Sequence, residues 1–313
     1  MTQKVKKSFR LKNKYVFARA KKSLGQNFLK SELALRKIIE AGEIKTDDVI
    51  LEIGPGKGAL TEKLLEKALL VVAVEKDREL FEFLKEKFAE QIKSGSMLLI
   101  QGDILNFDIE KTSKNILERT LGRSDGDGQR KFSAENFRGE SENVFTGLKS
   151  YKIIANIPYN ITGAILKKFL TEKNQPEAMV LMVQHEVAQR ILARDGKESI
   201  LSVSVKAYGE PKMVAKVDKR YFSPAPKVNS AIISIKNISR KTFEKSGINE
   251  ERFWEIVKAG FAHKRKKLSS NLKNLKNKTG PLGEDLINKR AEDLTLADWI
   301  DLASKEAKNR PSE

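Results

Sequence analysis

Short apolar runs alternate with amphipathic stretches between residues 49 and 184, and this alternation constrains the fold more than any other feature. The apolar runs predict strands at 49–53, 69–74, 97–101, 152–155 and 178–184. The amphipathic stretches predict helices at 31–41, 59–67, 77–93 and 162–171. Strands separated by helices form βαβ units, which build a mostly parallel sheet covered by helices. We therefore expect an α/β fold.

The pattern changes toward the C-terminus. Runs at 201–208, 212–217 and 230–235 predict strands without helices between them, and hence an antiparallel hairpin at the sheet edge. After Asn237 the apolar spacing becomes helical, with one face at 253–261, a second helix at 268–275 and a last helix ending near Leu302. Thr295 and Asp298 have the spacing of a capping box for that last helix. We expect an α/β domain at 23–237 and a small all-α domain at 238–313.

Charge indicates the kind of partner. The chain has 60 Lys and Arg against 42 Asp and Glu, a net charge of +18 and a pI near 9.7. Such an excess favours a polyanion, either nucleic acid or an anionic membrane face. Residues 1–22 carry nine basic residues and no acidic one, which predicts a basic arm. The stretch at 120–143 is polar and lacks periodicity, so we expect a disordered surface insertion; the alternative is a loop that contacts RNA.

The composition also excludes several classes of protein. The absence of cysteine removes disulfides, thiolate zinc sites and cysteine nucleophiles, and the two histidines leave little for a metal centre. No apolar run approaches the length of a membrane span, and the N-terminus lacks the apolar stretch of a signal peptide. We expect a cytoplasmic protein without metal or membrane.

A glycine-rich turn follows the first predicted strand and begins the next helix. Gly54, Gly56 and Gly58 let the backbone turn sharply and approach a ligand, with N–H groups of the helix start facing it. Glu75 lies 21 residues beyond Gly54, at the end of the second strand, where a carboxylate can accept hydrogen bonds from ribose hydroxyls. The pattern predicts a nucleoside cofactor. A dinucleotide enzyme remains an alternative, because the turn also satisfies G-x-G-x-x-A.

Residues after the third and fourth strands predict the chemistry. Asp103 can reach the exocyclic amine of a bound adenine; the alternative is an aspartate that only caps a turn. An adenine N6 amine is a poor nucleophile, because its lone pair is delocalised into the ring. The Asn156 side-chain oxygen and the Ile157 carbonyl can accept its two hydrogens and aim the lone pair at a methyl-bearing sulfonium. Pro158 stiffens this turn, and Tyr159 supplies an aromatic wall for the base.

With these motifs the chain resembles the KsgA-type ribosomal RNA adenine dimethyltransferases, a family that also includes the Erm resistance methylases. The resemblance covers about residues 22–302 and rests on GQNFL at 25–29, the glycine turn, NIPY at 156–159 and FSPAPKVNS at 222–230. The segments QHEVAQR at 184–190, FAHKRKKLSSNL at 261–272 and RAEDL at 290–294 favour the KsgA branch. The insertion before Tyr151 departs from the family pattern.

The resemblance implies a Rossmann-like class I methyltransferase fold with a seven-stranded, mostly parallel sheet. It implies S-adenosyl-L-methionine as the methyl donor and transfer of two methyl groups to each adenosine. The family's cofactor contacts map onto Asn27, Leu29, Gly54, Glu75, Asp103 and Asn156. Its base-stacking aromatic maps onto Phe222, which would face Tyr159 across a flipped adenine.

The expected activity is N6-dimethylation of two adjacent adenosines in the loop of the hairpin near the 3′ end of 16S rRNA. The expected partner is the small ribosomal subunit, with a role in its biogenesis, and we expect a monomer. The run Lys264, Arg265, Lys266 and Lys267 is predicted to contact the RNA backbone; the alternative is a solvated helix turn. Two other functions stay open: Erm-like methylation of 23S rRNA, and a non-catalytic ribosome-assembly factor.

Overall fold

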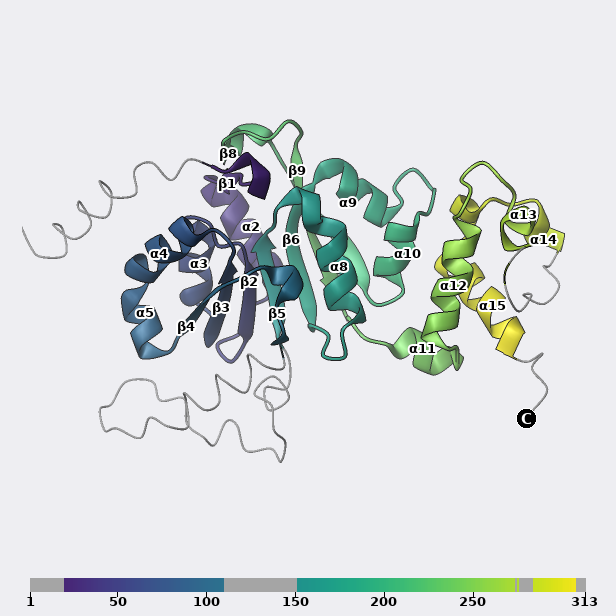
Figure 1. Cartoon of the computed structure of the whole chain (residues 1–313), viewed down its shortest axis with the longest axis horizontal. Coiled ribbons are helices and arrows are strands. Elements are labelled where there is room, and N and C mark those ends of the chain that lie inside the picture. The colour runs from purple at the N-terminus through teal and green to yellow at the C-terminus, as the bar shows by residue number, and fades with distance from the viewer. Residues whose placement is uncertain (1–19, 110–150, 274, 276–283, 308–313) are drawn as a thin grey trace, which may run out of the picture. The chain divides into compact units, whose positions relative to one another are not determined.

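The structure is a computed structural model that describes residues 20–109, 151–273, 275 and 284–307 (Figure 1). The predicted insertion at 120–143, and all but the last three residues of the predicted basic arm, lie outside the described residues. The chain divides into two compact units, residues 1–184 with 214–234, and residues 185–213 with 235–313. Residues 185–213 thus group with the C-terminal helices, and the domain boundary at 237 stays a prediction.

Seven strands form one sheet in the order β4-β3-β2-β5-β6-β9-β7 (Figure 1). They are β2 (Val49–Ile53), β3 (Leu70–Glu75), β4 (Met97–Gln101), β5 (Lys152–Asn156), β6 (Ala178–Gln184), β7 (Glu210–Val217) and β9 (Ser230–Lys236). β2 pairs in parallel with β3 and β5, β3 with β4, and β5 with β6. A separate antiparallel pair joins β1 (Phe28–Leu29) to β8 (Phe222–Ser223). The predicted seven-stranded, mostly parallel sheet is confirmed.

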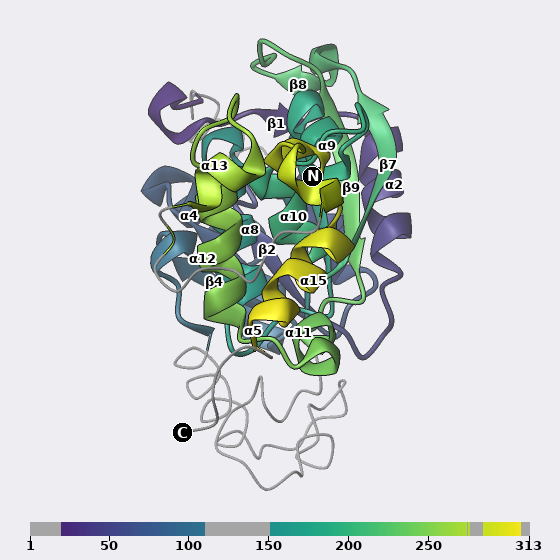
Figure 2. The same cartoon turned by 90° about the vertical axis from the view of Figure 1, so that its right-hand side faces the viewer.

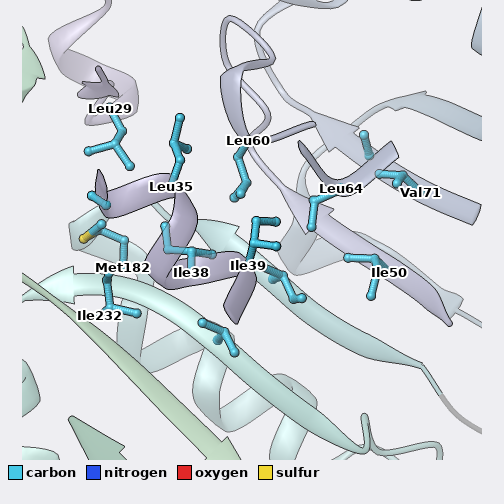
Figure 3. Close-up of a cluster of buried hydrophobic side chains, with 14 of the residues drawn as sticks. Leu29, Leu35, Ile38, Ile39, Ile50, Leu60, Leu64, Val71, Met182 and Ile232 are labelled. Atoms are coloured by element: carbon cyan, nitrogen blue, oxygen red, sulfur yellow. The ribbon is translucent and has the colours of Figure 1, made fainter. Parts of the chain in front are cut away.

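The central strands are held by a hydrophobic core on one face of the sheet. The helices α2 (Glu32–Gly42) and α3 (Ala59–Leu65) contribute aliphatic side chains that meet those of the strands (Figure 3). The helix α4 (Arg78–Lys87) adds Leu84 to the same core. Ile38 of α2, Leu64 of α3 and Ile50 of β2 are all fully buried. Each such side chain stabilises the fold by about 1.5–3 kcal/mol. The other face is covered by α8 (Thr162–Thr171), as Figures 1 and 2 show.

The strand predicted at 201–208 is wrong, because this segment forms α10 (Ile200–Lys206). Its β-branched valines favour a strand by propensity. Ser199 instead begins a helix through a capping box. Its hydroxyl accepts a hydrogen bond from the Ser202 N–H at 3.2 Å, and the Ser202 hydroxyl accepts one from the Ser199 N–H at 2.7 Å.

The single helix predicted at 77–93 is also wrong, because it is divided at Phe88 into α4 and α5 (Ala89–Ser94). Phe88 has φ −105° and ψ 27°, outside the helical range. Its ring packs so closely on the glycine turn that a Cβ at Gly58 would lie 2.6 Å from it. Packing of this ring overrides local helical propensity.

The second unit is mainly helical, as predicted for the C-terminal region. Its elements include α9 (His185–Leu192), α11 (Lys241–Ser246), α12 (Glu250–Gly260), α13 (Leu268–Leu272), α14 (Glu284–Ile287) and α15 (Leu296–Ala307). The capping box is confirmed, since Thr295 N–H donates to Asp298 at 2.8 Å and Asp298 N–H donates to the Thr295 hydroxyl at 3.2 Å. α12 packs on α15 (Figure 2). Within the described ranges, no helix has the length and apolar character that a bilayer crossing requires.

Two helical glycines give a matched test of this packing. A Cβ at Gly260 in α12 would lie 2.4 Å from the buried Trp299 ring, whereas a Cβ at Gly163 in α8 would meet nothing within 4 Å. We expect Gly260→Ala to destabilise the protein by about 1–3 kcal/mol through overpacking. Gly163→Ala should be neutral or should stabilise by up to about 1 kcal/mol, because alanine is the better helix former. Urea unfolding of the two variants measures the difference, and equal midpoints would contradict the predicted packing.

Candidate active site at the ends of four parallel strands

The carboxyl ends of β2, β3, β4 and β5 border a pocket of about 200 Å³ in the first unit. These four strands are neighbours in the sheet, so residues that follow them meet at one edge. The pocket brings together eight of the residues predicted from sequence: Asn27, Leu29, Gly54, Glu75, Asp103, Asn156, Ile157 and Tyr159.

The glycine turn has the backbone geometry that its composition predicts. Gly54, Gly56 and Gly58 have φ values of 64°, 60° and 76°, in the left-handed region that glycine adopts without strain. The Gly54 N–H donates to the Val74 carbonyl at 3.0 Å and ties the turn to β3. The Phe28 ring lies so close that a Cβ at Gly56 would be 3.0 Å from it. Each glycine therefore serves a turn or a close approach.

Glu75 at the end of β3 is a buried carboxylate with a fixed orientation. It is 5% exposed, and its two oxygens accept hydrogen bonds from the Gly56 N–H at 3.1 Å and the Asp77 N–H at 2.9 Å. Burial raises its pKa, and these backbone hydrogen bonds oppose the rise. Each carboxylate oxygen has more than one lone pair, so both can accept further hydrogen bonds from a ligand.

Asp103 follows β4 and caps the 3₁₀ turn Ile104–Asn106. One oxygen accepts from the Leu105 N–H at 3.0 Å, and the other accepts from Lys76 Nζ at 2.8 Å. The bond from Lys76 holds the pKa of Asp103 below its usual range, with help from the Leu105 N–H. The capping role is thus present, and the carboxylate also lines the pocket. Its role toward adenine stays a prediction.

Asn156 ends β5 with its amide held in one orientation. Its Nδ2 donates to the Asn27 carbonyl at 3.0 Å, and Asn27 Nδ2 in turn donates to the Gly25 carbonyl at 3.0 Å. No described residue donates to Asn156 Oδ1, so this oxygen can accept from a ligand. The neighbouring Ile157 is 2% exposed and lines the same pocket.

The two predicted aromatic walls have different surroundings. Tyr159 lines the pocket, and its hydroxyl lies 2.5 Å from the Ser230 hydroxyl. Burial raises the pKa of Tyr159, and the contact with Ser230 opposes the rise. Phe222 is only 2% exposed, pairs with Leu29 across β1 and β8, and belongs to the hydrophobic core. The structure does not bring Phe222 into the pocket, and its predicted stacking would require the ring to leave this core.

The predicted RNA contacts lie in the second unit. Lys264, Arg265, Lys266 and Lys267 are all exposed on the loop between α12 and α13. Lys267 Nζ donates to Asn288 Oδ1 at 2.8 Å. Three basic side chains of this loop thus project without a hydrogen bond or ion pair to another described residue. Their contact with RNA stays a prediction.

Two acidic residues in or beside this site were not predicted from the sequence. Glu52 in β2 lines the pocket and is 1% exposed; burial raises its pKa to about 8. Asp77 is 4% exposed and accepts hydrogen bonds from Lys21 Nζ at 2.7 Å and Gln26 Nε2 at 2.8 Å. For Glu52, the sequence did offer a signal, because an acidic residue stands within an apolar strand. For Asp77 the hydrogen-bond partners lie about fifty residues away in the chain, so no local pattern indicated its role. In the described part of the chain, no cluster of His, Asp or Glu could hold a metal ion.

Comparisons with known proteins agree with this geometry. A family model described as ribosomal RNA adenine dimethylase matches residues 17–308. The ribosomal RNA small subunit methyltransferase A of Dehalococcoides mccartyi (strain CBDB1) is 37% identical over 298 residues, 93% of this chain and 90% of that protein. The protein of the same name from Fusobacterium nucleatum is 34% identical over 291 residues, 90% of this chain and 96% of that protein.

Solved structures agree with the fold. A dimethyladenosine transferase from Plasmodium falciparum has a TM-score of 0.66 at 24% identity and covers 90% of this chain and 98% of its own. The 23S rRNA methyltransferase ErmE has a TM-score of 0.62 at 22% identity, with coverage of 90% and 100%. At these identities the two structures show the fold alone. The family model extends over nearly the whole chain, so this protein belongs to the ribosomal RNA adenine dimethylase family.

Proposed function

We propose that this protein is an S-adenosylmethionine-dependent dimethyltransferase that modifies N6 of two adjacent adenosines near the 3′ end of 16S rRNA. One observation carries the proposal: the Asn156 amide is held by the Asn27 carbonyl so that its oxygen can accept from a substrate amine. The curated relatives are named small subunit methyltransferases, which favours the small subunit over 23S rRNA. A role in small-subunit biogenesis, in the cytoplasm, follows from this substrate.

The residues of the pocket fit the proposed cofactor. A ribose matches the buried Glu75 carboxylate, and the turn at Gly54 and Gly56 allows close approach of the backbone. Asp103 lines the pocket, which supports a contact with the amine of an adenine, and a Cβ on the preceding Gly102 would meet nothing within 4 Å. Asn27 and Leu29 line the same pocket, which suits their family role. When bound, the cofactor supplies an electrophilic methyl group.

The residues of the Asn156 turn perform the positioning. Asn156 Oδ1 and the Ile157 carbonyl accept the two N6 hydrogens and direct the nitrogen lone pair toward the methyl group. Tyr159 provides a wall for the adenine ring. As the N–C bond forms, the bond between the methyl carbon and the donor's sulfur would break and leave a neutral thioether. The nitrogen would become cationic and would release one proton to water. Fixed acceptors stabilise this developing positive charge without a strong general base.

Two features argue against the alternative functions. A non-catalytic assembly factor does not need the Glu75, Asp103 and Asn156 arrangement, because RNA binding alone requires no cofactor pocket. The likeness to ErmE concerns the fold alone. Mapping of N6-methylated adenosines in RNA from cells with and without this gene tests the proposal directly. The proposal would be overturned if cells without the gene lost methylation from 23S rRNA instead of 16S rRNA, or lost it from neither RNA.

Asn156→Ala should reduce methyl transfer by about 10²–10³, the usual cost of losing one positioned polar group in an active site. The effect should fall on turnover, because the amide acts mainly on the substrate amine. Single-turnover transfer of labelled methyl groups to small-subunit particles measures the rate, and calorimetry checks that the cofactor still binds. A wild-type rate in this variant would contradict the proposed role.

Glu75→Gln should weaken cofactor binding by about tenfold or more, since a charge-assisted hydrogen bond is worth roughly 1.5–3 kcal/mol. The amide nearly preserves the volume of the carboxylate but removes its charge and one acceptor. Titration calorimetry with S-adenosylmethionine measures the change in Kd. An unchanged Kd would show that the ribose is bound elsewhere.

Replacing Lys264, Arg265, Lys266 and Lys267 together by alanine should weaken RNA binding and leave cofactor affinity unchanged. Each lost phosphate contact lowers the slope of log K against log salt by about 0.7–0.9. A salt series with hairpin RNA measures this slope. The matched control converts the three lysines to arginine, which retains the charge and should retain the slope. Identical slopes for the alanine variant and the parent protein would show that the loop is solvated and does not contact RNA phosphates.

A further inference from the structure

The segment from Lys21 to Leu29, of which residues 23–29 line the pocket, is attached to three separate parts of the first unit. At its C-terminal end, Leu29 pairs with Phe222 across the two-stranded sheet. In its middle, the Asn27 carbonyl accepts the hydrogen bond from Asn156 Nδ2. At its N-terminal end, it meets Asp77 at the start of α4. The orientation of the Asn156 amide therefore depends on where this segment lies.

Asp77 binds the segment through both carboxylate oxygens. Oδ1 accepts from Lys21 Nζ at 2.7 Å, and Oδ2 accepts from Gln26 Nε2 at 2.8 Å. The Gln26 side chain also accepts from the Lys21 backbone N–H at 2.7 Å, which closes the segment into a compact loop. Burial would raise the pKa of Asp77, but the bonds from Lys21 and Gln26 outweigh burial and keep that pKa below its usual range. The carboxylate is ionised, so it needs these donors.

The same residue also contacts the predicted ribose site. The Asp77 backbone N–H donates to Glu75 at 2.9 Å, and the other Glu75 oxygen accepts from the Gly56 N–H. One residue thus touches the pocket segment through its side chain and the Glu75 carboxylate through its backbone. The glycine turn, Glu75, Asp77 and the segment form a continuous chain of hydrogen bonds that ends at Asn156.

We propose that Asp77 is a positioning residue that latches the segment 21–27, so that the Asn27 carbonyl holds the Asn156 amide oxygen toward the substrate amine. This inference rests on the proposed function, because it concerns the rate of methyl transfer. When both donors are removed, Asp77 is left as a buried carboxylate without a side-chain partner. Such a group is costly, and opening of the segment lets water reach it. The Asn27 carbonyl then moves, and the Asn156 amide loses its fixed orientation.

The test changes the donors, because Asp77 itself caps α4 by accepting from the Glu79 N–H at 3.0 Å. We replace Lys21 and Gln26 together by methionine, which keeps side-chain length and removes both bonds to Asp77. With saturating cofactor and small-subunit particles, the single-turnover rate should fall about 10- to 100-fold, the effect expected from a misplaced reacting group. The thermal midpoint should change little, because the cap of α4 and the core remain.

Two matched variants separate the latch from general charge effects. Glu79→Gln alters only the outer partner of Lys21, a 3.2 Å contact to a side chain that is 60% exposed, and should leave the rate unchanged. Lys21→Arg, with Gln26 intact, keeps a cation on Asp77 and should restore a rate close to that of the wild-type protein.

A double variant that transfers methyl groups at the wild-type rate overturns the latch and leaves the proposed function intact. A rate that recovers fully at higher cofactor concentration also overturns it, because the segment would then only retain the cofactor. A wild-type protein that methylates no small-subunit particle overturns the proposed function, and the latch with it.

Discussion

The parallel pairing of β4, β3, β2 and β5 is the constraint on which the whole site depends. Their register places Ile53 opposite Val74 and Glu75 opposite Gln101, so the strands end almost together. Gly54, Glu75 and Asp103 reach one pocket because each stands at or just beyond such an end. Three of these strands are almost wholly buried, which makes the edge rigid. A rigid edge suits a reaction that depends on distances between acceptors and a weak nucleophile.

The parts of the fold that follow from local patterns could be predicted from sequence. Apolar runs bounded by glycines or polar residues predicted all seven sheet strands in the order of the chain, each close to its observed bounds. Residues 201–208 show the limit of such patterns. Their valines favour extended structure, but a capping box at Ser199 and burial of Val203 and Val205 select a helix. Propensity is weaker than a satisfied helix start combined with packing.

Properties of the site that depend on distant contacts could not be read from the sequence. The motif containing Phe222 predicts an aromatic wall, yet pairing of β8 with β1 turns this ring into the core. The donors of Asp77 stand 56 and 51 residues before it in the chain, and no spacing rule connects them. Burial of Glu52 depends on how the sheet and its helices close around it. In each case a neighbour supplied by the tertiary fold determines the role of the residue.

The charges of this protein are distributed as its two proposed ligands require. RNA is a polyanion, and the net charge of +18 favours its approach from a distance. The proposed methyl donor carries a cationic sulfonium, and the pocket presents the carboxylates of Glu75 and Asp103. Burial of Glu75 limits screening by solvent, so its interaction with a cation is stronger than at the surface. Binding of this donor needs a locally acidic pocket, because a uniformly basic protein would repel a cationic cofactor.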